Sequence, residues 1–171
     1  NNNMSLELIV GCMFAGKTTE IINITNRLQK INEEPFVIKP RIDNRYSNNK
    51  IYSHNELKIC CNTVDKLSVI DNIKEKYIII DEAQFFSDLY EFVKKKVDNE
   101  KKHVIVIGLD GDSDRKNFGE IHKLLPLCDN IVKLKAYCLT CKDGTLALFS
   151  KRLVSNDNQI LVGTNQFIPV C

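Results

Sequence analysis

Two kinds of segment are missing from this sequence: an apolar run long enough to cross a bilayer, and an N-terminal signal-peptide pattern. A strong excess of one charge is missing as well, because 24 lysines and arginines stand against 22 acidic residues, a net charge of +2. That balance is too even to indicate a nucleic-acid partner. We find no internal repeat and no low-complexity tract. We therefore expect a cytoplasmic protein that binds neither membranes nor nucleic acid.

The seven cysteines are odd in number and scattered, which is not the framework of a disulfide-rich secreted protein. A length of 171 residues and a hydrophobic content of 43% suit one main domain with a sizeable core. A small additional unit also fits within that length. The cysteines therefore need another explanation, and three of them are taken up below.

A phosphate-loop motif follows the first apolar run, residues 6–10, which predicts a buried strand. Residues 11–18 match the pattern G-x-x-x-x-G-K-[ST]. Its two glycines let the backbone curl so that amide groups face phosphate oxygens, and the helix that follows adds the positive end of its dipole. We expect Lys17 to reach the outer phosphates and the Thr18 hydroxyl to bind Mg²⁺. The predicted phosphate site comprises Gly11, Cys12, Met13, Phe14, Ala15, Gly16, Lys17 and Thr18.

An acidic pair follows a second apolar segment. Residues 77–80 form a continuous apolar run, which predicts a central strand of a parallel sheet. Asp81 and Glu82 come directly after it, a placement typical of phosphoryl-transfer enzymes that carry a phosphate loop. We expect Asp81 to hold Mg²⁺ and Glu82 to act as a general base. The alternative is that both carboxylates only cap the helix that begins near Asp88.

Strands and helices alternate over residues 5–135, which predicts an α/β fold with a parallel sheet and helices on both faces. The expected helices are 18–31, 64–73, a segment from 88 onward and 121–125, the last closed by Pro126. The expected strands include 36–39, 104–109 and 131–134, with an extended excursion or hairpin at 51–60. Lysines 94–96 are expected to be solvated. We assign residues 1–135 to a nucleotide-binding domain and 136–171 to a small zinc-binding and loop domain.

Two polar loops, 41–49 and 110–119, follow predicted strands. In open α/β sheets, ligands usually bind at the carboxyl ends of strands. Taken alone, however, the loop at 41–49 is more simply a solvated loop, because charged loops are common.

A Cys-x-x-Cys motif, Cys138 and Cys141, lies after the last predicted strand, and Cys171 lies 30 residues beyond Cys141. This spacing is typical of structural zinc, although zinc takes four ligands and only three are placed here. The rival interpretation is a redox-active motif, which normally lies at a helix N-terminus. The surrounding sequence favours a zinc knuckle.

Three segments together resemble thymidine kinases of the cellular and poxvirus type. They are GCMFAGKTTE at 11–20, DEAQFF at 81–86 with LDGDSDRKNFG at 109–119, and the Cys-x-x-Cys followed by FSKRL and a terminal VC. The resemblance implies phosphate transfer from ATP to thymidine with Mg²⁺, a structural zinc, a homotetramer and feedback inhibition by dTTP.

The resemblance also implies residue roles. Glu82 corresponds to the catalytic carboxylate that takes the proton from the thymidine 5′-hydroxyl, and Asp81 and Gln84 belong to the same element. Asp43 and Arg45, with Asn44 between them, match a D-x-R motif near the transferred phosphate. Around the base the resemblance places Met13, Phe85, Leu109, Ser113, Arg115, Phe118, Ser150, Phe167 and a lasso loop of Asn158, Gln159, Ile160, Leu161, Val162 and Gly163.

The sequence departs from the family pattern at several places. Ser113 stands where the family often has an aromatic residue, Phe167 where it often has tyrosine, and Val162 where it often has glycine. The stretch between Cys141 and Ser150 is slightly longer than is usual in the family.

Cytosine presents the opposite donor–acceptor edge to thymine, so in a site that reads the thymine edge it would leave a buried donor and acceptor unpaired. We therefore expect thymidine and deoxyuridine to be accepted and deoxycytidine and purine nucleosides to be rejected.

Two other classes of protein share single features with this sequence. A GTPase-like switch would carry a guanine-reading N-K-x-D motif, and residues 117–120, NFGE, are not one. A zinc-stabilised nucleic-acid-binding ATPase would carry a clustered basic face rich in aromatic residues. The net charge of +2 argues against it.

Overall fold

The computed structural model describes residues 4–42, 50–52, 58–154, 158–161 and 165–171. Its centre is a sheet of six parallel strands in the order β5-β2-β6-β7-β1-β8. These strands are β1 (Ser5–Gly11), β2 (Phe36–Pro40), β5 (Asn62–Val64), β6 (Tyr77–Ile80), β7 (His103–Gly108) and β8 (Asn130–Leu134). The predicted parallel α/β sheet is confirmed.

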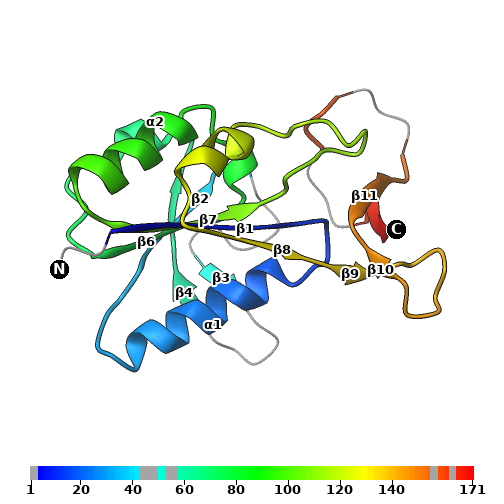
Figure 1. Cartoon of the computed structure of the whole chain (residues 1–171), viewed down its shortest axis with the longest axis horizontal. Helices are drawn as coiled ribbons and strands as arrows, with labels where there is room; N and C mark the ends of the chain where they lie inside the picture. The colour runs from blue at the N-terminus through cyan, green and yellow to red at the C-terminus, as the bar shows by residue number, and fades with distance from the viewer. Residues whose placement is uncertain (1–3, 43–49, 53–57, 155–157, 162–164) are drawn as a thin grey trace.

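Alternate side chains of the strands enter two cores, one on each face of the sheet. On one face, strand residues such as Ile9 and Ile79 pack against α1 (Lys17–Gln29), whose Ile21 is fully buried. On the other face, Leu8 and Ile80 pack with α2 (Leu89–Lys94), which continues as a π-helical segment, η3 (Lys95–Asn99). Figure 1 shows α1 and α2 on opposite sides of the sheet, as predicted.

Residues 64–73 do not form the helix that we predicted for them. The chain here forms the edge strand β5, which pairs with β2, and then a single 3₁₀ turn, η1 (Leu67–Val69). The apolar spacing that suggested a helix instead sends Leu67 and Ile73 into the core from an irregular chain. Two further 3₁₀ segments are present: η2 (Ala83–Phe85) follows β6, and η4 (Ile121–Leu127) precedes β8. Pro126 lies inside η4 and does not close it as predicted.

The expectation that lysines 94–96 are all solvated is wrong for Lys96, whose side chain is only 2% exposed. Its ammonium donates to both carboxylate oxygens of Glu100, at 3.0 and 2.9 Å, and lies over the Phe92 ring. A charged group is buried here because it is paired.

Four short strands pair outside the main sheet after β8, and a separate hairpin lies between β2 and β5. The pairs are β9 (Ala136–Tyr137) with β10 (Leu146–Ala147) and β11 (Phe149–Arg152) with β12 (Phe167–Val170), both antiparallel. The hairpin joins β3 (Lys50–Tyr52) to β4 (Lys58–Cys60), in agreement with the predicted excursion.

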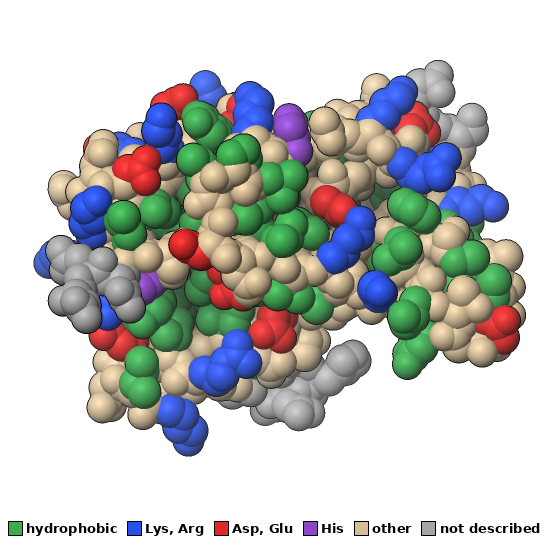
Figure 2. All heavy atoms as spheres, viewed as in Figure 1, with side chains coloured by type: hydrophobic (Ala, Val, Ile, Leu, Met, Phe, Trp, Pro, Cys, Tyr) green, Lys and Arg blue, Asp and Glu red, His purple; other side chains and the backbone are tan. Residues whose placement is uncertain are grey.

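On the face in Figure 2, acidic and basic side chains are interspersed, and hydrophobic side chains gather over η4. Four exposed hydrophobic residues come from η4 and β8, namely Leu125, Leu127, Ile131 and Val132. Among the described residues, no helix has the length and apolar character that spanning a membrane requires.

Candidate active site

The phosphate-loop motif lies between the end of β1 and the start of α1, the arrangement that the sequence predicts. Gly16 has a φ of 87°, a left-handed conformation that glycine adopts without strain, and no side chain caps the first turn of α1. Lys17 is buried, and its ammonium donates to the carbonyls of Gly11 and Cys12 at 3.1 and 2.8 Å. The loop therefore curls around the Lys17 ammonium and leaves the helix amides without a side-chain partner.

The acidic pair lies just past β6. Glu82 is buried, and its φ of 47° and ψ of 42° place it in the left-handed region. Such a conformation is uncommon in a residue other than glycine and is found most often at functional sites. The Asp81 carboxylate accepts the Glu82 amide at 2.8 Å. Neither carboxylate caps α2, because the residue before α2 is Asp88 and it makes no side-chain cap either.

Gln84 fixes the orientation of Glu82. Its side-chain amide donates to Glu82 Oε2 at 2.6 Å, and its carbonyl oxygen accepts the Leu109 amide at 3.0 Å. A Cβ at Gly108 would overlap Gln84 Oε1, so glycine at this position leaves room for the glutamine. The buried carboxylate of Glu82 is thus connected, through the Gln84 side chain, to the backbone of Leu109 just after β7.

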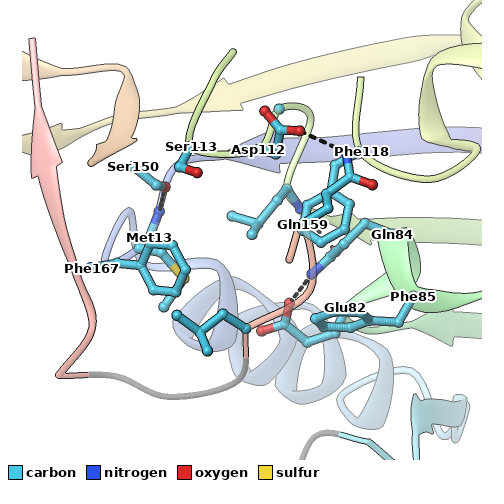
Figure 3. A pocket seen from close by; sticks show the side chains of 13 residues that line it. Met13, Glu82, Gln84, Phe85, Asp112, Ser113, Phe118, Ser150, Gln159 and Phe167 are labelled. Carbon is cyan, nitrogen blue, oxygen red and sulfur yellow. Dashed lines mark hydrogen bonds between the residues drawn. The ribbon is translucent and has the colours of Figure 1, made fainter. Parts of the chain in front are cut away.

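A pocket opens beside the phosphate loop and ends at Glu82 (Figure 3). Phe85 and Phe118 meet edge to face at 5.5 Å between ring centroids. The lining residues come from the phosphate loop, the segment after β6, the loop after β7, β11, β12 and the segment 158–161: Met13, Glu82, Gln84, Phe85, Leu109, Gly111, Asp112, Ser113, Phe118, Ser150, Gln159, Leu161 and Phe167.

Asp112 joins two segments that line the pocket. One of its carboxylate oxygens accepts the amides of Asp114 and Lys116, and the other accepts Gln159 Nε2 at 2.6 Å. Partial burial raises the pKa of Asp112, but the hydrogen bonds from Gln159 and from the two amides outweigh it, so this pKa lies below its usual value. The carboxylate therefore stays ionised and ties residues 158–161 to the loop after β7.

Ser150, on β11, ties the phosphate loop to the C-terminal strands. Its hydroxyl is buried and accepts the amide of Met13 at 2.9 Å, as Figure 3 shows. The Cys12 thiol also lies 3.6 Å from the Ala147 carbonyl oxygen on β10. One wall of the pocket is therefore fixed by direct contacts between the phosphate loop and the C-terminal strands.

A second lysine adds positive charge near the carboxyl end of the sheet. Lys39, in β2, is only 1% exposed, and its ammonium has no hydrogen-bond partner among the described residues. The neighbouring residues Val37 and Ile38 enter the α1 core and the α2 core respectively, so alternation places Lys39 on the α1 face. A buried ammonium of this kind favours an anionic ligand nearby.

Comparison with known proteins places this arrangement in a family. The sequence profile described as "Thymidine kinase" matches residues 4–171. The thymidine kinase of Amsacta moorei entomopoxvirus is 39% identical over 181 aligned residues, which cover 98% of this chain and 96% of the relative. That of monkeypox virus is 38% identical (99% and 96% covered), and that of Bacteroides thetaiotaomicron is 37% identical (97% and 84% covered). The chain belongs to the thymidine kinase family. It is therefore a phosphotransferase of nucleosides.

The structure brings together most residues that the thymidine kinase resemblance assigned to the base. The pocket is lined by Met13, Phe85, Leu109, Ser113, Phe118, Ser150, Gln159, Leu161 and Phe167, together with Glu82 and Gln84. Arg115, Asn158 and Ile160 do not line it, and Arg115 instead packs over the Phe149 ring at 5.5 Å. Asp43, Asn44, Arg45, Val162 and Gly163 lie outside the described residues.

Sequence reasoning missed two lining residues, Gly111 and Asp112. The available signal was their place in the polar loop at the carboxyl end of an apolar strand, where ligands of α/β proteins usually bind. It pointed to the loop but could not say which of its side chains turn inward.

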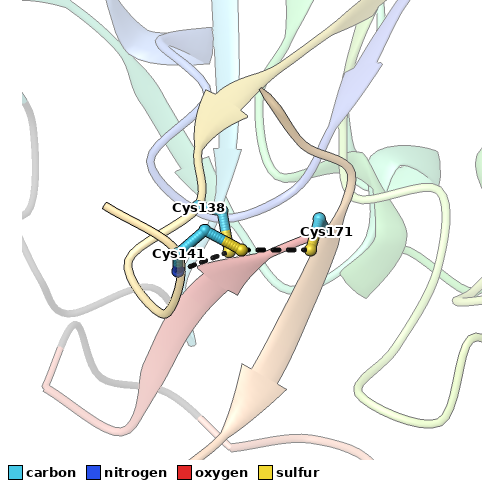
Figure 4. Close-up of side chains that lie close together, drawn as sticks. All are labelled: Cys138, Cys141 and Cys171. Carbon is cyan, nitrogen blue, oxygen red and sulfur yellow. Dashed lines mark hydrogen bonds between the residues drawn. The ribbon is translucent and has the colours of Figure 1, made fainter. Parts of the chain in front are cut away.

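Three cysteines form a cluster among the C-terminal strands (Figure 4). The sulfurs of Cys138, Cys141 and Cys171 all lie within 4.8 Å of one another, and those of Cys141 and Cys171 are 3.8 Å apart. Hydrogen bonds from the amides of Cys141 and Cys171 lower the pKa of Cys138 to about 6. Hydrogen bonds with the thiols of Cys138 and Cys171 raise the pKa of Cys141 to about 11.

The cluster fits a zinc ion. Two sulfurs at the usual Zn–S distance of about 2.3 Å in tetrahedral geometry lie roughly 3.8 Å apart, which is the separation of Cys141 and Cys171. The Cys141 amide also donates to the sulfur of Cys138 at 3.4 Å, as suits a thiolate ligand. The described residues supply three cysteine ligands. The cluster lies on β-strand connections rather than at a helix N-terminus, which disfavours the redox alternative.

Proposed function

We propose that the protein transfers the γ-phosphoryl group of ATP to the 5′-hydroxyl of thymidine and releases dTMP and ADP, a salvage step for DNA synthesis. The observation that carries the proposal is the place of Glu82. Its carboxylate is held by Gln84 at 2.6 Å, at the end of a pocket that the phosphate-loop residue Met13 also lines. A general base at this position lies between the proposed site of the nucleoside, which accepts the phosphate, and the proposed site of ATP, which donates it.

Glu82 orients the 5′-hydroxyl and accepts its proton as the oxygen attacks the γ-phosphorus. The bond from that phosphorus to the β,γ-bridging oxygen breaks, and ADP leaves with the bonding pair. Lys17, the loop amides and the N-terminus of α1 stabilise the charge on the phosphate oxygens. We extend this role to Arg45, with Asp43 and Asn44 beside it, on the resemblance alone.

The donor set at the phosphate loop fits Mg²⁺, because a hydroxyl and a carboxylate are oxygen ligands. Thr18 and Asp81 would hold the ion, which neutralises charge on the transferred phosphate when bound. Asp81 is buried at the end of β6, a position that favours a cation beside it.

The segment from Asn158 onward acts as the lasso that holds the base through main-chain groups. This role is supported by Gln159 and Leu161, which line the pocket, and by the bond from Gln159 to Asp112. Main-chain groups in a fixed loop read one donor–acceptor edge, so thymidine and deoxyuridine are accepted while deoxycytidine is rejected. Closure over the pocket also excludes water and limits hydrolysis of ATP.

Four further features complete the proposal. Zinc binds Cys138, Cys141 and Cys171 and stabilises a small unit at 136–171 that packs on the nucleotide-binding domain, 1–135. The chain forms a homotetramer, which would cover exposed hydrophobic residues of η4 and β8 such as Leu125 at 49% and Ile131 at 47% exposed.

Since dTTP carries both thymidine and a triphosphate, it suits both the nucleoside site and the phosphate site and acts as an inhibitor. The protein works in the cytoplasm.

Incubation of the protein with γ-labelled ATP, Mg²⁺ and thymidine tests the reaction directly. The proposal predicts labelled dTMP whose formation requires thymidine, and little release of labelled phosphate without it. A protein that hydrolyses ATP at the same rate with and without thymidine, and forms no dTMP, would not have the proposed function.

A further inference from the structure

Lys39 and Asp81 lie side by side on one face of the sheet. The Asp81 amide donates to the Ile38 carbonyl at 2.8 Å, which continues the pairing of β2 with β6 by one residue and sets Asp81 beside Lys39. Val37 and Ile79, two positions earlier in each strand, both enter the α1 core. Alternation therefore places the side chains of Lys39 and Asp81 on the α1 face, on strands about 4.8 Å apart.

The Lys39 ammonium is a buried charge in need of a compensating anion. The side chain is 1% exposed and makes no hydrogen bond with any residue that the structure describes. Burying a charge is costly unless an opposite charge offsets it. On the other side of Lys39 the paired residue, in β5, is the uncharged Thr63. Of the two residues beside Lys39 in the adjacent strands, Asp81 is thus the one that supplies negative charge.

The proposed metal site lies on this same face of the sheet. α1 packs there, and its first turn contains Thr18, the second proposed ligand of Mg²⁺. A divalent cation held by Asp81 would therefore be close to the like charge of Lys39, and both would compete for one carboxylate. The phosphates of ATP would relieve this repulsion, because they bring several negative charges to the site. This step rests on the proposed function, which assigns the metal to Thr18 and Asp81.

We propose that Lys39 is a positioning residue that acts through Asp81. While no nucleotide is bound, its ammonium offsets the charge of the Asp81 carboxylate and lowers the affinity of the protein for a divalent cation. Once ATP adds its negative charge, the same ammonium no longer opposes the binding of Mg²⁺ at Asp81. Lys39 thereby makes metal binding depend on the nucleotide.

The test is the affinity of the full chain for Mn²⁺, measured without nucleotide by electron paramagnetic resonance. Lys39→Met removes the charge but keeps a long, unbranched side chain. We expect this variant to bind Mn²⁺ roughly tenfold more tightly than the parent, because a like charge close to the ion is gone. Lys39→Gln, a second neutral variant, should change the affinity in the same direction. Lys74→Met, at an exposed position, is the matched control and should leave the affinity unchanged.

Two further titrations show whether the effect depends on Asp81 and on the phosphates. When Asp81→Asn is also present, the gain from Lys39→Met should disappear, as a double-mutant cycle requires of two coupled residues. With ATP bound, the gain should fall to about threefold or less, because the phosphates then dominate the local charge.

An unchanged or weaker affinity for Mn²⁺ in both neutral variants would overturn the inference, as would a gain that persists in the presence of Asp81→Asn. A lysine that only packs against the core would give the first of these results, since methionine reproduces its stem. All titrations omit thymidine, so they do not depend on phosphate transfer. Failure to form dTMP would instead refute the proposed function.

Discussion

At the scale of single residues, the site depends on a carboxylate in an uncommon backbone conformation that one glutamine holds in place. Glu82 has a positive φ, and Gln84 connects its carboxylate to the Leu109 amide. The sequence predicted the carboxylate, because Glu82 follows an apolar strand downstream of a phosphate loop. It could not predict the role of Gln84, since that role depends on the contact between β7 and the segment after β6.

Glu82→Gln should leave nucleotide and nucleoside binding intact and lower turnover by about two to four orders of magnitude, because the amide cannot accept the proton. Single-turnover phosphate transfer, together with calorimetric binding of thymidine, measures both. Near-normal turnover in this variant would remove Glu82 from the base role. Glu91→Gln, at an exposed position of α2, is a matched control that should change neither.

Lys17→Ala should weaken ATP binding roughly ten- to a hundredfold, the loss of one charge-assisted contact, and leave thymidine affinity nearly unchanged. The buried Lys17 side chain contacts loop carbonyls, so the variant's melting temperature must be recorded as well. Equal ATP affinity in a folded variant would show that the loop does not hold the phosphates.

At the scale of elements, continuous apolar runs made β1, β6 and β7 predictable. The spacing of Gly11 and Gly16 before Lys17 made the phosphate loop predictable. The edge strand β5 and the 3₁₀ turn after it were missed. Three-residue strands carry too little pattern, and the helix-like spacing of Leu67 and Ile73 belongs to an irregular chain that sends both side chains into the core. The buried Lys96 was missed because its partner Glu100 and the π-helical turn that orients it are not visible in composition.

The bond between Asp112 and Gln159 should hold the lasso element over the pocket. Gln159→Ala should raise the KM for thymidine roughly three- to tenfold, because one hydrogen bond of the closed state is lost, with a smaller effect on kcat. Gln29→Ala, at the far end of α1, serves as the control. An unchanged KM would show that the lasso closes without this contact.

The pKa of Asp112 gives the same contact a pH dependence. Since this pKa is lower in the folded state than in the unfolded state, its contribution to stability is present above the unfolded value and is lost as the pH falls through the folded value. The difference in unfolding free energy between the parent and Asp112→Asn should therefore be constant near neutral pH and shrink in acid. A difference that grows in acid would contradict the assignment.

The cysteine cluster brings the connection after β9 close to the end of β12. Elemental analysis should find one zinc per chain, and Cys138→Ser should lose it and lower the melting temperature by several degrees, because metal binding is coupled to folding. Cys60→Ser, at an exposed cysteine outside the cluster, is the control. A protein that is equally stable and active without metal would point to another role for the three cysteines.

At the scale of the whole molecule, the parallel sheet places the phosphate loop, Glu82 and the loop after β7 together at the carboxyl ends of its strands. The C-terminal strands close the pocket from the side. The order of motifs along the chain was enough to predict the fold class and the family. The lining of the pocket was predictable mainly through the resemblance, because Ser150, Gln159 and Phe167 come from strands and loops with no motif of their own.

We propose that this pocket selects a pyrimidine by one edge and presents the 5′-hydroxyl of the nucleoside to Glu82. The most direct measurement is kcat/KM with ATP and Mg²⁺ for thymidine, deoxyuridine, deoxycytidine and deoxyguanosine. We predict comparable values for the first two and values lower by roughly one to two orders of magnitude or more for the others, since each unpaired buried polar group costs about 1–3 kcal/mol. Deoxycytidine or deoxyguanosine used as well as thymidine would contradict this account of the site.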